Sequence, residues 1–353
     1  MARALNKNTK IIRDFILNTL IDDANAVISI TRQEFGVTRQ TVSRHLKKLV
    51  EVGDVIARGE TKSRTYVLAP KISESIDIDV SPKTEEDSVW SHQVRPLISD
   101  INKNILEICH YGVTEMLNNV IDHSGADSAR IYIFRTAVSI HLGIIDKGIG
   151  IFDKIQKDFK LEDPRQALLE LSKGKLTSDS DNHSGEGIFF TSRMFDKFVI
   201  RSGKMYYACT PSNEDYLFES LDKQYIEGTT IRMTIALNAT RDSTDVFNKF
   251  TTSDDDHAFS KTHVPVFLAR YDHDQLISRS SAKRVLARFT KFKEVWLDFQ
   301  GVEKVGQAFA DEIFRVYAKA NPDVELRCSN ANDDVKSMII RAMDKLKEQT
   351  KSD

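Results

Sequence analysis

Features typical of several protein classes are missing from this sequence of 353 residues. The three cysteines, Cys109, Cys209 and Cys328, lie far apart and have neither CxxC nor Cys/His spacing, which argues against a disulfide framework and a zinc site. No run of about 18 apolar residues could cross a bilayer, and the basic N-terminus lacks the apolar stretch of a secretory signal peptide. We therefore expect a cytoplasmic protein that does not contact the membrane.

An overall excess of one charge is also missing, because the net charge is only −2. The distribution is uneven, however, since residues 1–70 contain twelve Lys/Arg and seven Asp/Glu. Residues 71–89 are acidic with few large apolar side chains, and residues 251–263 are also polar. We expect linkers at both stretches, which leaves domains at residues 1–70, 90–250 and 264–353.

The N-terminal domain has apolar residues at helical spacing from Lys10 to Leu20, and a short β-like run follows at Ala26–Ile30. Thr38 is a good N-cap for a later helix, and strand-like runs at 55–58 and 64–68 flank a polar tip. This order, and the sequence VTRQTVSRHLKKLVEVGDVIARG, resemble a bacterial winged helix-turn-helix.

The resemblance implies binding to double-stranded DNA, with polar residues of one helix in the major groove and basic residues at the phosphates. We expect groove contacts from Arg39, Gln40, Ser43 and Arg44, and backbone contacts from Lys47, Lys48 and Lys62. The alternatives are an ordinary solvated helix face and a winged helix that contacts only proteins.

Two motifs in the central domain place polar side chains next to apolar segments. On a helix, Glu115, Asn119 and either Asp122 or His123 lie one turn apart, which suits a hydrated Mg²⁺ that also contacts phosphates. A strand-like run then ends in DKGIG at Asp146, where a carboxylate can accept a hydrogen bond from an exocyclic amine and the glycines let a flat ring approach.

Two further motifs follow. Gly185-Glu186-Gly187 enters a helix whose free N–H groups suit phosphate, and Gly228-Thr229-Thr230 opens a β-run. The order and spacing of all four motifs resemble the N, G1 and G2 boxes and the closing Gly-Thr of the GHKL ATPase family (gyrase, heat-shock chaperone, histidine kinase, MutL), over about residues 90–237.

This resemblance implies a two-layer α/β sandwich of the Bergerat type, with a mixed sheet on one side, that binds ATP and Mg²⁺. It also implies roles for individual residues: Glu115 as general base, Asn119 as Mg²⁺ ligand, Asp146 as adenine reader, Gly148 and Gly150 as ring floor, Ser184, Gly185 and Gly187 at the phosphates, and Thr229 behind the adenine contact. Chance GxG motifs in an unrelated α/β domain are the alternative.

The branch of the family depends on Glu115, which sensor histidine kinases commonly lack. With His123 the spacing resembles anti-sigma serine kinases, whereas with Asp122 it resembles MutL and gyrase; both need a general base. The segment 91–97 resembles a phosphoacceptor box, but only 22 residues lie between His92 and Glu115, too few for a two-helix hairpin. We interpret it as a capped helix start.

Beyond Val264, predicted strands and helices alternate, which indicates a small α/β layer. The sequence LDFQGVEKVGQAFADEIF resembles STAS domains of anti-sigma antagonists, but Gly306-Gln307-Ala308 stands where that family has Asp-Ser-Ser. Phosphoswitching at this helix is therefore not expected, and Ser280 and Ser281 are more typical of helix caps. We interpret the domain as a surface for dimerisation or for docking a protein partner.

The predicted fold class is thus multidomain α+β: a winged helix, a GHKL α/β sandwich and a STAS-like domain. The combination indicates an ATP- and Mg²⁺-dependent regulator, in which a segment from Gly174 to Gly185 closes over the nucleotide and alters how a homodimer presents its winged helices to DNA. The alternative is an anti-sigma-like serine kinase that acts on a protein partner.

Overall fold

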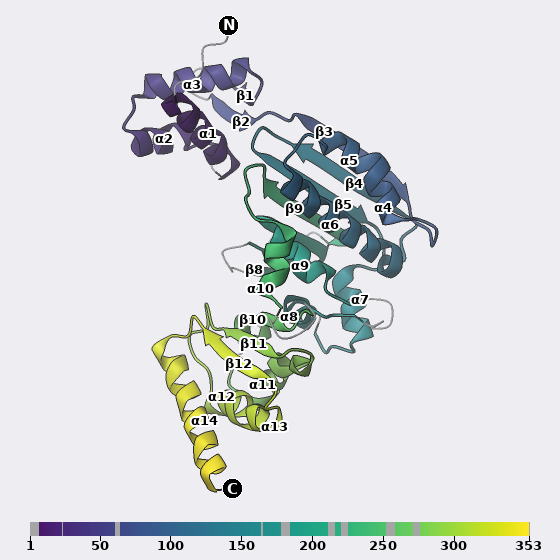
Figure 1. Cartoon of the computed structure of the whole chain (residues 1–353), viewed down its shortest axis with the longest axis vertical. Coiled ribbons are helices and arrows are strands. Elements are labelled where there is room, and N and C mark those ends of the chain that lie inside the picture. The colour runs from purple at the N-terminus through teal and green to yellow at the C-terminus, as the bar shows by residue number, and fades with distance from the viewer. Residues whose placement is uncertain are drawn as a thin grey trace.

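The computed structural model describes residues 7–22, 24–60, 64–163, 165–177, 184–210, 216–219, 225–251, 258–270 and 276–352, which form three domains along the chain (Figure 1). The N-terminal domain contains helices α1 (Lys7–Asp22), α2 (Val27–Phe35) and α3 (Arg39–Glu51) and the antiparallel hairpin of β1 (Val55–Arg58) and β2 (Thr65–Leu68). Apolar side chains from all three helices and β1 form a core of their own.

The prediction of a β-like run at Ala26–Ile30 is wrong, because this segment begins helix α2. Its β-branched residues favour strands only weakly, and packing against neighbouring elements overrides that preference. In a helix, Val27 and Thr31 lie one turn apart and are both buried, and the Thr31 hydroxyl donates to the Val27 carbonyl at 2.7 Å.

The central domain is built on a seven-stranded sheet with the order β3-β4-β5-β9-β6-β7-β8. Its strands are β3 (Ile72–Asp79), β4 (Ser128–Arg135), β5 (Ser139–Asp146), β6 (Lys197–Gly203), β7 (Met205–Cys209), β8 (Tyr216–Glu219) and β9 (Ile226–Ala236). All neighbouring pairs of these described strands are antiparallel, so the prediction of a mixed sheet is wrong. Tight connections such as the three residues between β4 and β5 permit only antiparallel pairing.

Helices cover one face of this sheet and make the domain two-layered (Figure 1). The described helices of this domain are α4 (Glu86–Val89), a π-helical stretch (Trp90–Val94), α5 (Arg95–Ile98), α6 (Lys103–Asn119), a π-helical turn (Val120–Ser124), α7 (Ile151–Asp158), α8 (Gln166–Lys173), α9 (Gly187–Met194) and α10 (Ser243–Lys249), of which α8 lies below the sheet, beside β10 (Figure 1). Strand β4 alternates buried and exposed residues from Ser128 to Phe134, as expected when only one face of a sheet is covered.

The expected acidic linker at residues 71–89 is instead largely regular structure. Strand β3 pairs with β4 along its whole length, and α4 begins at Glu86. The acidic side chains of β3 are exposed, while Ile78 is buried and Ile76 packs on the core. The segment 91–97 therefore lies inside a helical stretch that begins at Glu86, not at a capped helix start.

The C-terminal domain has a parallel sheet in the order β10-β11-β12. Its elements are β10 (Lys261–Pro265), a 3-10 helix (Val266–Ala269), α11 (Arg279–Leu286), a 3-10 turn (Phe289–Lys291), β11 (Glu294–Asp298), α12 (Gln307–Asp311), a π-helical stretch (Glu312–Tyr317), α13 (Ala318–Ala320), β12 (Glu325–Ser329) and α14 (Asp333–Ser352). Strand β10 thus begins inside the expected linker at 251–263.

The central and C-terminal domains share one continuous hydrophobic core, whereas the N-terminal core is separate. Phe259 packs against both domains. The centroid of its ring lies 4.5 Å from that of Phe189 on α9 and 5.4 Å from that of Phe292 beside β11. The N-terminal core is contacted from the central domain by Ala137 and Val138 in the β4–β5 turn. None of the helices described is long and apolar enough to span a membrane.

Candidate nucleotide-binding site

Two adjoining cavities lie between α6, α7 and α9 at the end of β5. The first is mainly apolar and reaches Asp146, Gly150 and Thr229, while the second is polar and reaches Glu115 and the glycines before α9. Residues shared by the two are Asn119, His123, Leu171, Leu176, Thr177 and Ile188. The four sequence motifs, of which the first and the last lie more than a hundred residues apart in the sequence, therefore meet at one place.

Asp146 lines the apolar cavity and is only 4% exposed. Burial raises the pKa of its carboxyl above the ordinary 3.8, while hydrogen bonds from the backbone N–H groups of Gly148 and Thr229 act in the opposite direction. The Gly148 N–H donates to Oδ1 at 2.8 Å. Asp146 therefore presents a hydrogen-bond acceptor to an apolar space, as recognition of an exocyclic amine requires.

Both glycines expected under the ring are needed by the backbone itself. A Cβ at Gly148 would lie 2.1 Å from the carbonyl oxygen of Ser124, and Gly150 has φ +88°. A Cβ at Gly150 would also lie 2.6 Å from Oγ of Ser202. The loop after β5 therefore packs directly on the end of the π-helical turn and on β6. Gly150 lines the apolar cavity, whereas Gly148 is not among the lining residues of either cavity.

Thr229 connects this loop to β9. It is paired with Asp146 in the β5–β9 register, and its hydroxyl accepts a hydrogen bond from the Ile151 N–H at 3.0 Å. Gly228 before it has φ +70°, and its carbonyl accepts from the Ser202 hydroxyl at 2.7 Å. Thr229 thus fixes the start of α7 against the strand that carries Asp146.

The polar stripe of α6 faces the second cavity. Glu115, Asn119, Asp122 and His123 all line it, so the structure brings both candidates for the third position to the site. Asp122 and His123 follow Asn119 by three and four residues, so both lie about one turn further along the same face, in the π-helical turn that begins at Val120. His123 also lines the apolar cavity, whereas Asp122 does not line that cavity.

The Gly-rich entry to α9 completes the polar cavity. Ser184, Gly185 and Gly187 line it, and α9 begins at Gly187. A Cβ at Gly187 would lie 2.0 Å from Oε2 of Glu115, so this carboxylate and the helix N-terminus are in close contact. Free N–H groups at a helix start and a neighbouring carboxylate are a suitable arrangement for phosphate and for a general base.

Several lining residues were not found from the sequence. Leu176 and Thr177, just after α8, lie between the two cavities, and Ile188 lies on α9. These residues belong to no sequence motif, because the wall residues of a cavity can be recognised only once the fold brings them together. Residues 178–183 of the expected closing segment lie outside the described part of the chain.

A preformed protein cage for a metal ion is not seen: the described residues contain no group of three or more His, Cys, Asp or Glu side chains placed for one. Asn119 is nevertheless suited to Mg²⁺, because this ion is usually held by one or two protein oxygens together with phosphates and water.

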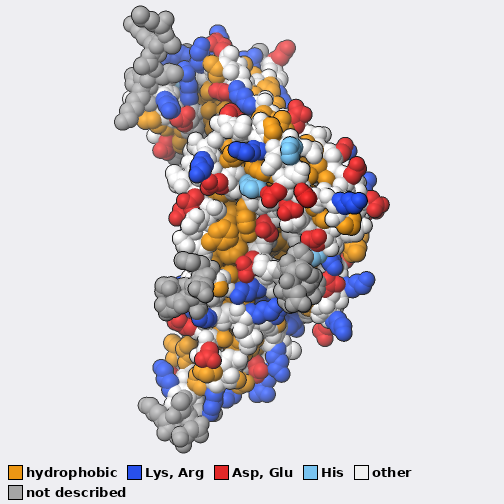
Figure 2. Space-filling model, turned by 45° about the vertical axis from the view of Figure 1, so that its right-hand side comes forward, with side chains coloured by type: hydrophobic (Ala, Val, Ile, Leu, Met, Phe, Trp, Pro, Cys, Tyr) orange, Lys and Arg blue, Asp and Glu red, His pale blue; other side chains and the backbone are white. Residues whose placement is uncertain are grey.

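The helix predicted to enter DNA is α3, and Thr38 caps it by accepting from the Thr41 N–H at 3.2 Å. Arg39, Gln40, Arg44, Lys47 and Lys48 are exposed on α3, Ser43 is half-buried, and Lys62 lies outside the described residues. Lys48 also forms an ion pair with Glu51 at 3.0 Å. On the face in Figure 2, Lys and Arg side chains are interspersed with Asp and Glu.

Comparison with known proteins supports one of the three domains. Residues 281–336 match the model of a STAS-like domain of unknown function (DUF4325), which confirms the prediction of a STAS-like domain at the C-terminus. No curated protein matches the chain. The match covers α11 to the start of α14 and therefore lies outside both cavities.

Proposed function

We propose that the central domain is a GHKL-type module that binds Mg-ATP, and that nucleotide binding or slow hydrolysis controls DNA binding by an N-terminal winged helix. One observation carries the proposal: the buried carboxylate of Asp146 lines an apolar cavity, and this cavity shares Asn119 and other lining residues with an adjoining polar cavity. ATP has the same division, because its flat base has a donating amine and its phosphates are anionic.

The residues of the polar cavity suggest how ATP would be held and used. Asn119 would hold Mg²⁺ together with phosphate and water oxygens, and the bound ion would supply positive charge to the phosphates. Glu115 lies one turn earlier on α6 and is placed to accept a proton from an attacking water or hydroxyl.

Strand β5 offers a physical route between nucleotide and DNA. The β4–β5 turn contacts the N-terminal core through Ala137 and Val138, and β5 then runs to Asp146 in the cavity. Near the same turn, the Lys71 ammonium pairs with Asp54 at 2.8 Å and donates to the Gly53 carbonyl at 3.0 Å. A rigid strand with one end at each site can transmit a change of position.

A salt-dependent titration of mixed-sequence duplex DNA with and without Mg-ATP tests the proposal. We expect Mg-ATP to change the affinity, and Lys47→Ala, which removes a proposed phosphate contact on α3, to reduce the dependence on salt by about one counterion. Arg32→Ala is the matched control, because Arg32 is an exposed arginine of α2 outside the proposed DNA-binding face. Equal affinities with and without Mg-ATP, or no DNA binding, would end the proposal.

A protein serine kinase is the second candidate. Two observations favour it: His123 lines both cavities at the position that resembles anti-sigma kinases, and a STAS-like domain is part of the same chain. Labelled ATP separates the candidates, since label on protein indicates a kinase and free phosphate an ATPase. Glu115→Ala should abolish either turnover and preserve ATP binding.

A further inference from the structure

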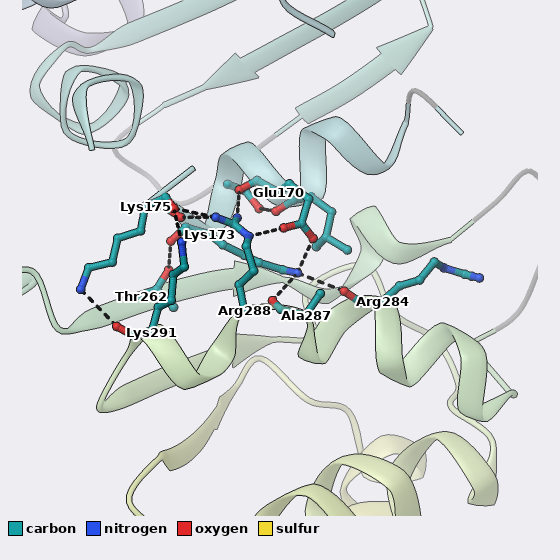
Figure 3. A network of polar contacts seen from close by, with 11 residues as sticks. Glu170, Lys173, Lys175, Thr262, Arg284, Ala287, Arg288 and Lys291 are labelled. Carbon is teal, nitrogen blue, oxygen red and sulfur yellow. Dashed lines mark hydrogen bonds and ion pairs between the residues drawn. The ribbon is translucent and has the colours of Figure 1, made fainter. Parts of the chain in front are cut away.

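Helix α8 ends on groups of the C-terminal domain (Figure 3). The last carbonyls of a helix have no partner within it and must be satisfied from elsewhere. The Arg288 guanidinium donates to the carbonyls of Glu170, Gly174 and Lys175 at 2.8, 3.2 and 2.7 Å, and the Thr262 hydroxyl donates to that of Lys173 at 2.6 Å. The C-terminal domain therefore caps this helix.

Buried charges strengthen the same contact. The Lys173 ammonium is fully buried and donates to Glu170 Oε1 at 2.6 Å and to the carbonyls of Arg284 and Ala287, both at 3.0 Å. Arg288 Nε donates to Glu170 Oε2 at 2.6 Å. Burial lowers the pKa of Lys173 to about 8 and Glu170 opposes this, so Lys173 is an ammonium at neutral pH with an acceptor for each of its three N–H bonds.

The residues held in this way continue directly into the proposed nucleotide site. Gly174 fits between aromatic rings, since a Cβ there would lie 2.7 Å from the ring of Phe259. Leu176 and Thr177 line both cavities, and the Leu176 N–H donates to the Gly185 carbonyl at 3.0 Å. The carbonyl bound by Arg288 and the N–H bound to Gly185 thus belong to the same peptide group, the one that joins Lys175 to Leu176.

We propose that Arg288 is a positioning residue for the nucleotide site: by holding Gly174 and Lys175, it fixes Leu176 and Thr177 as the wall shared by the two cavities. This inference rests on the proposed nucleotide function. Docking of the STAS-like domain then sets nucleotide affinity, and nucleotide stabilises the docked domain by the same factor, because coupling between two equilibria is reciprocal.

The variant Arg288→Ala in the full chain tests this with two measurements. Without nucleotide, we expect hydrogen exchange at the Leu176 amide to become at least about tenfold faster; with Mg-ATP, we expect affinity to fall at least about tenfold, within the usual range of such couplings. Arg279→Ala is the matched control, because Arg279 is a 68% exposed arginine on α11 that pairs at 3.9 Å with Glu312 of its own domain. It should change neither measurement.

A less disruptive variant keeps the inference testable if Arg288→Ala fails to fold. Thr262→Val removes only the hydroxyl that donates to the Lys173 carbonyl, and it should shift both measurements in the same direction by a smaller factor. Unchanged exchange in Arg288→Ala, or faster exchange with unchanged affinity, would overturn the inference. A wild-type chain that binds no nucleotide would refute the proposed function instead, and the exchange measured without nucleotide would still decide whether Arg288 holds the wall.

Discussion

Asp146 combines an ionisable group with a nearly closed apolar environment. Its carboxyl is 4% exposed, and burial raises its pKa above 3.8. In the nucleotide-free protein the folded state therefore binds this proton more readily than the unfolded state does. The stability that this group contributes is fully present below its ordinary pKa and is lost as the pH rises through the raised value.

Nucleotide affinity should depend on pH in the opposite direction to this stability, because the ionised carboxylate of Asp146 is the stronger acceptor for an adenine amine. We expect Mg-ATP affinity to fall as the pH is lowered through the raised pKa of Asp146. Asp146→Asn should cost about 1.5–3 kcal/mol of binding at neutral pH, the usual value for a hydrogen bond to a charged group. Calorimetric titration across pH checks both statements; a variant that binds as tightly as wild type, or keeps the same pH dependence, would contradict the role of Asp146.

At the scale of single elements, the start of α9 is constrained by α6. Gly187 is the first residue of α9, and a Cβ there would lie 2.0 Å from Oε2 of Glu115. In an unobstructed helix, Gly→Ala stabilises by about 0.5–1 kcal/mol. Here the added methyl group must displace the Glu115 carboxylate or move the helix start.

We therefore expect Gly187→Ala to weaken Mg-ATP binding and to slow turnover at least about tenfold, as loss of a positioned general base would. Gly143→Ala is the control, because a Cβ at Gly143 on β5 meets its nearest atom at an ordinary 3.5 Å. Binding and turnover rates of the two variants give the comparison. A Gly187→Ala protein that is merely more stable, with unchanged binding, would show that the contact is not functional.

Elements also show how far the sequence predicts this protein. Residues of the motifs, such as Glu115, Asp146 and Gly187, are candidates from the sequence because polar side chains and glycines at fixed spacing indicate a function, and in the structure they line the two cavities. Strand β3 was missed because its exposed acidic side chains are typical of a solvated linker, although Ile76 and Ile78 pack on the core. Arg288 was missed because its partners lie more than a hundred residues away.

For the whole molecule, the arrangement of cores determines how the chain unfolds. The N-terminal domain has its own core and meets the central domain at the β4–β5 turn and through the Lys71–Asp54 ion pair. The central and C-terminal domains share one core and the buried Glu170–Lys173–Arg288 network. Cooperative units follow such continuous packing, so we expect two thermal transitions, with the second and third domains unfolding together.

Bound nucleotide should raise the Tm of only one of the two transitions. A ligand that binds only the folded state at a concentration of 100 times its Kd adds about 2.7 kcal/mol of stability, which for a large unit raises the Tm by roughly 5 °C. Scanning calorimetry of the full chain should show this shift in the larger transition and none in the smaller one, with a reduced shift in Asp146→Asn. Three separate transitions would mean that the C-terminal domain is not part of the nucleotide-binding unit, because a shared core requires the central and C-terminal domains to be stabilised together. A shift in the smaller transition alone would mean that nucleotide binds the N-terminal domain instead.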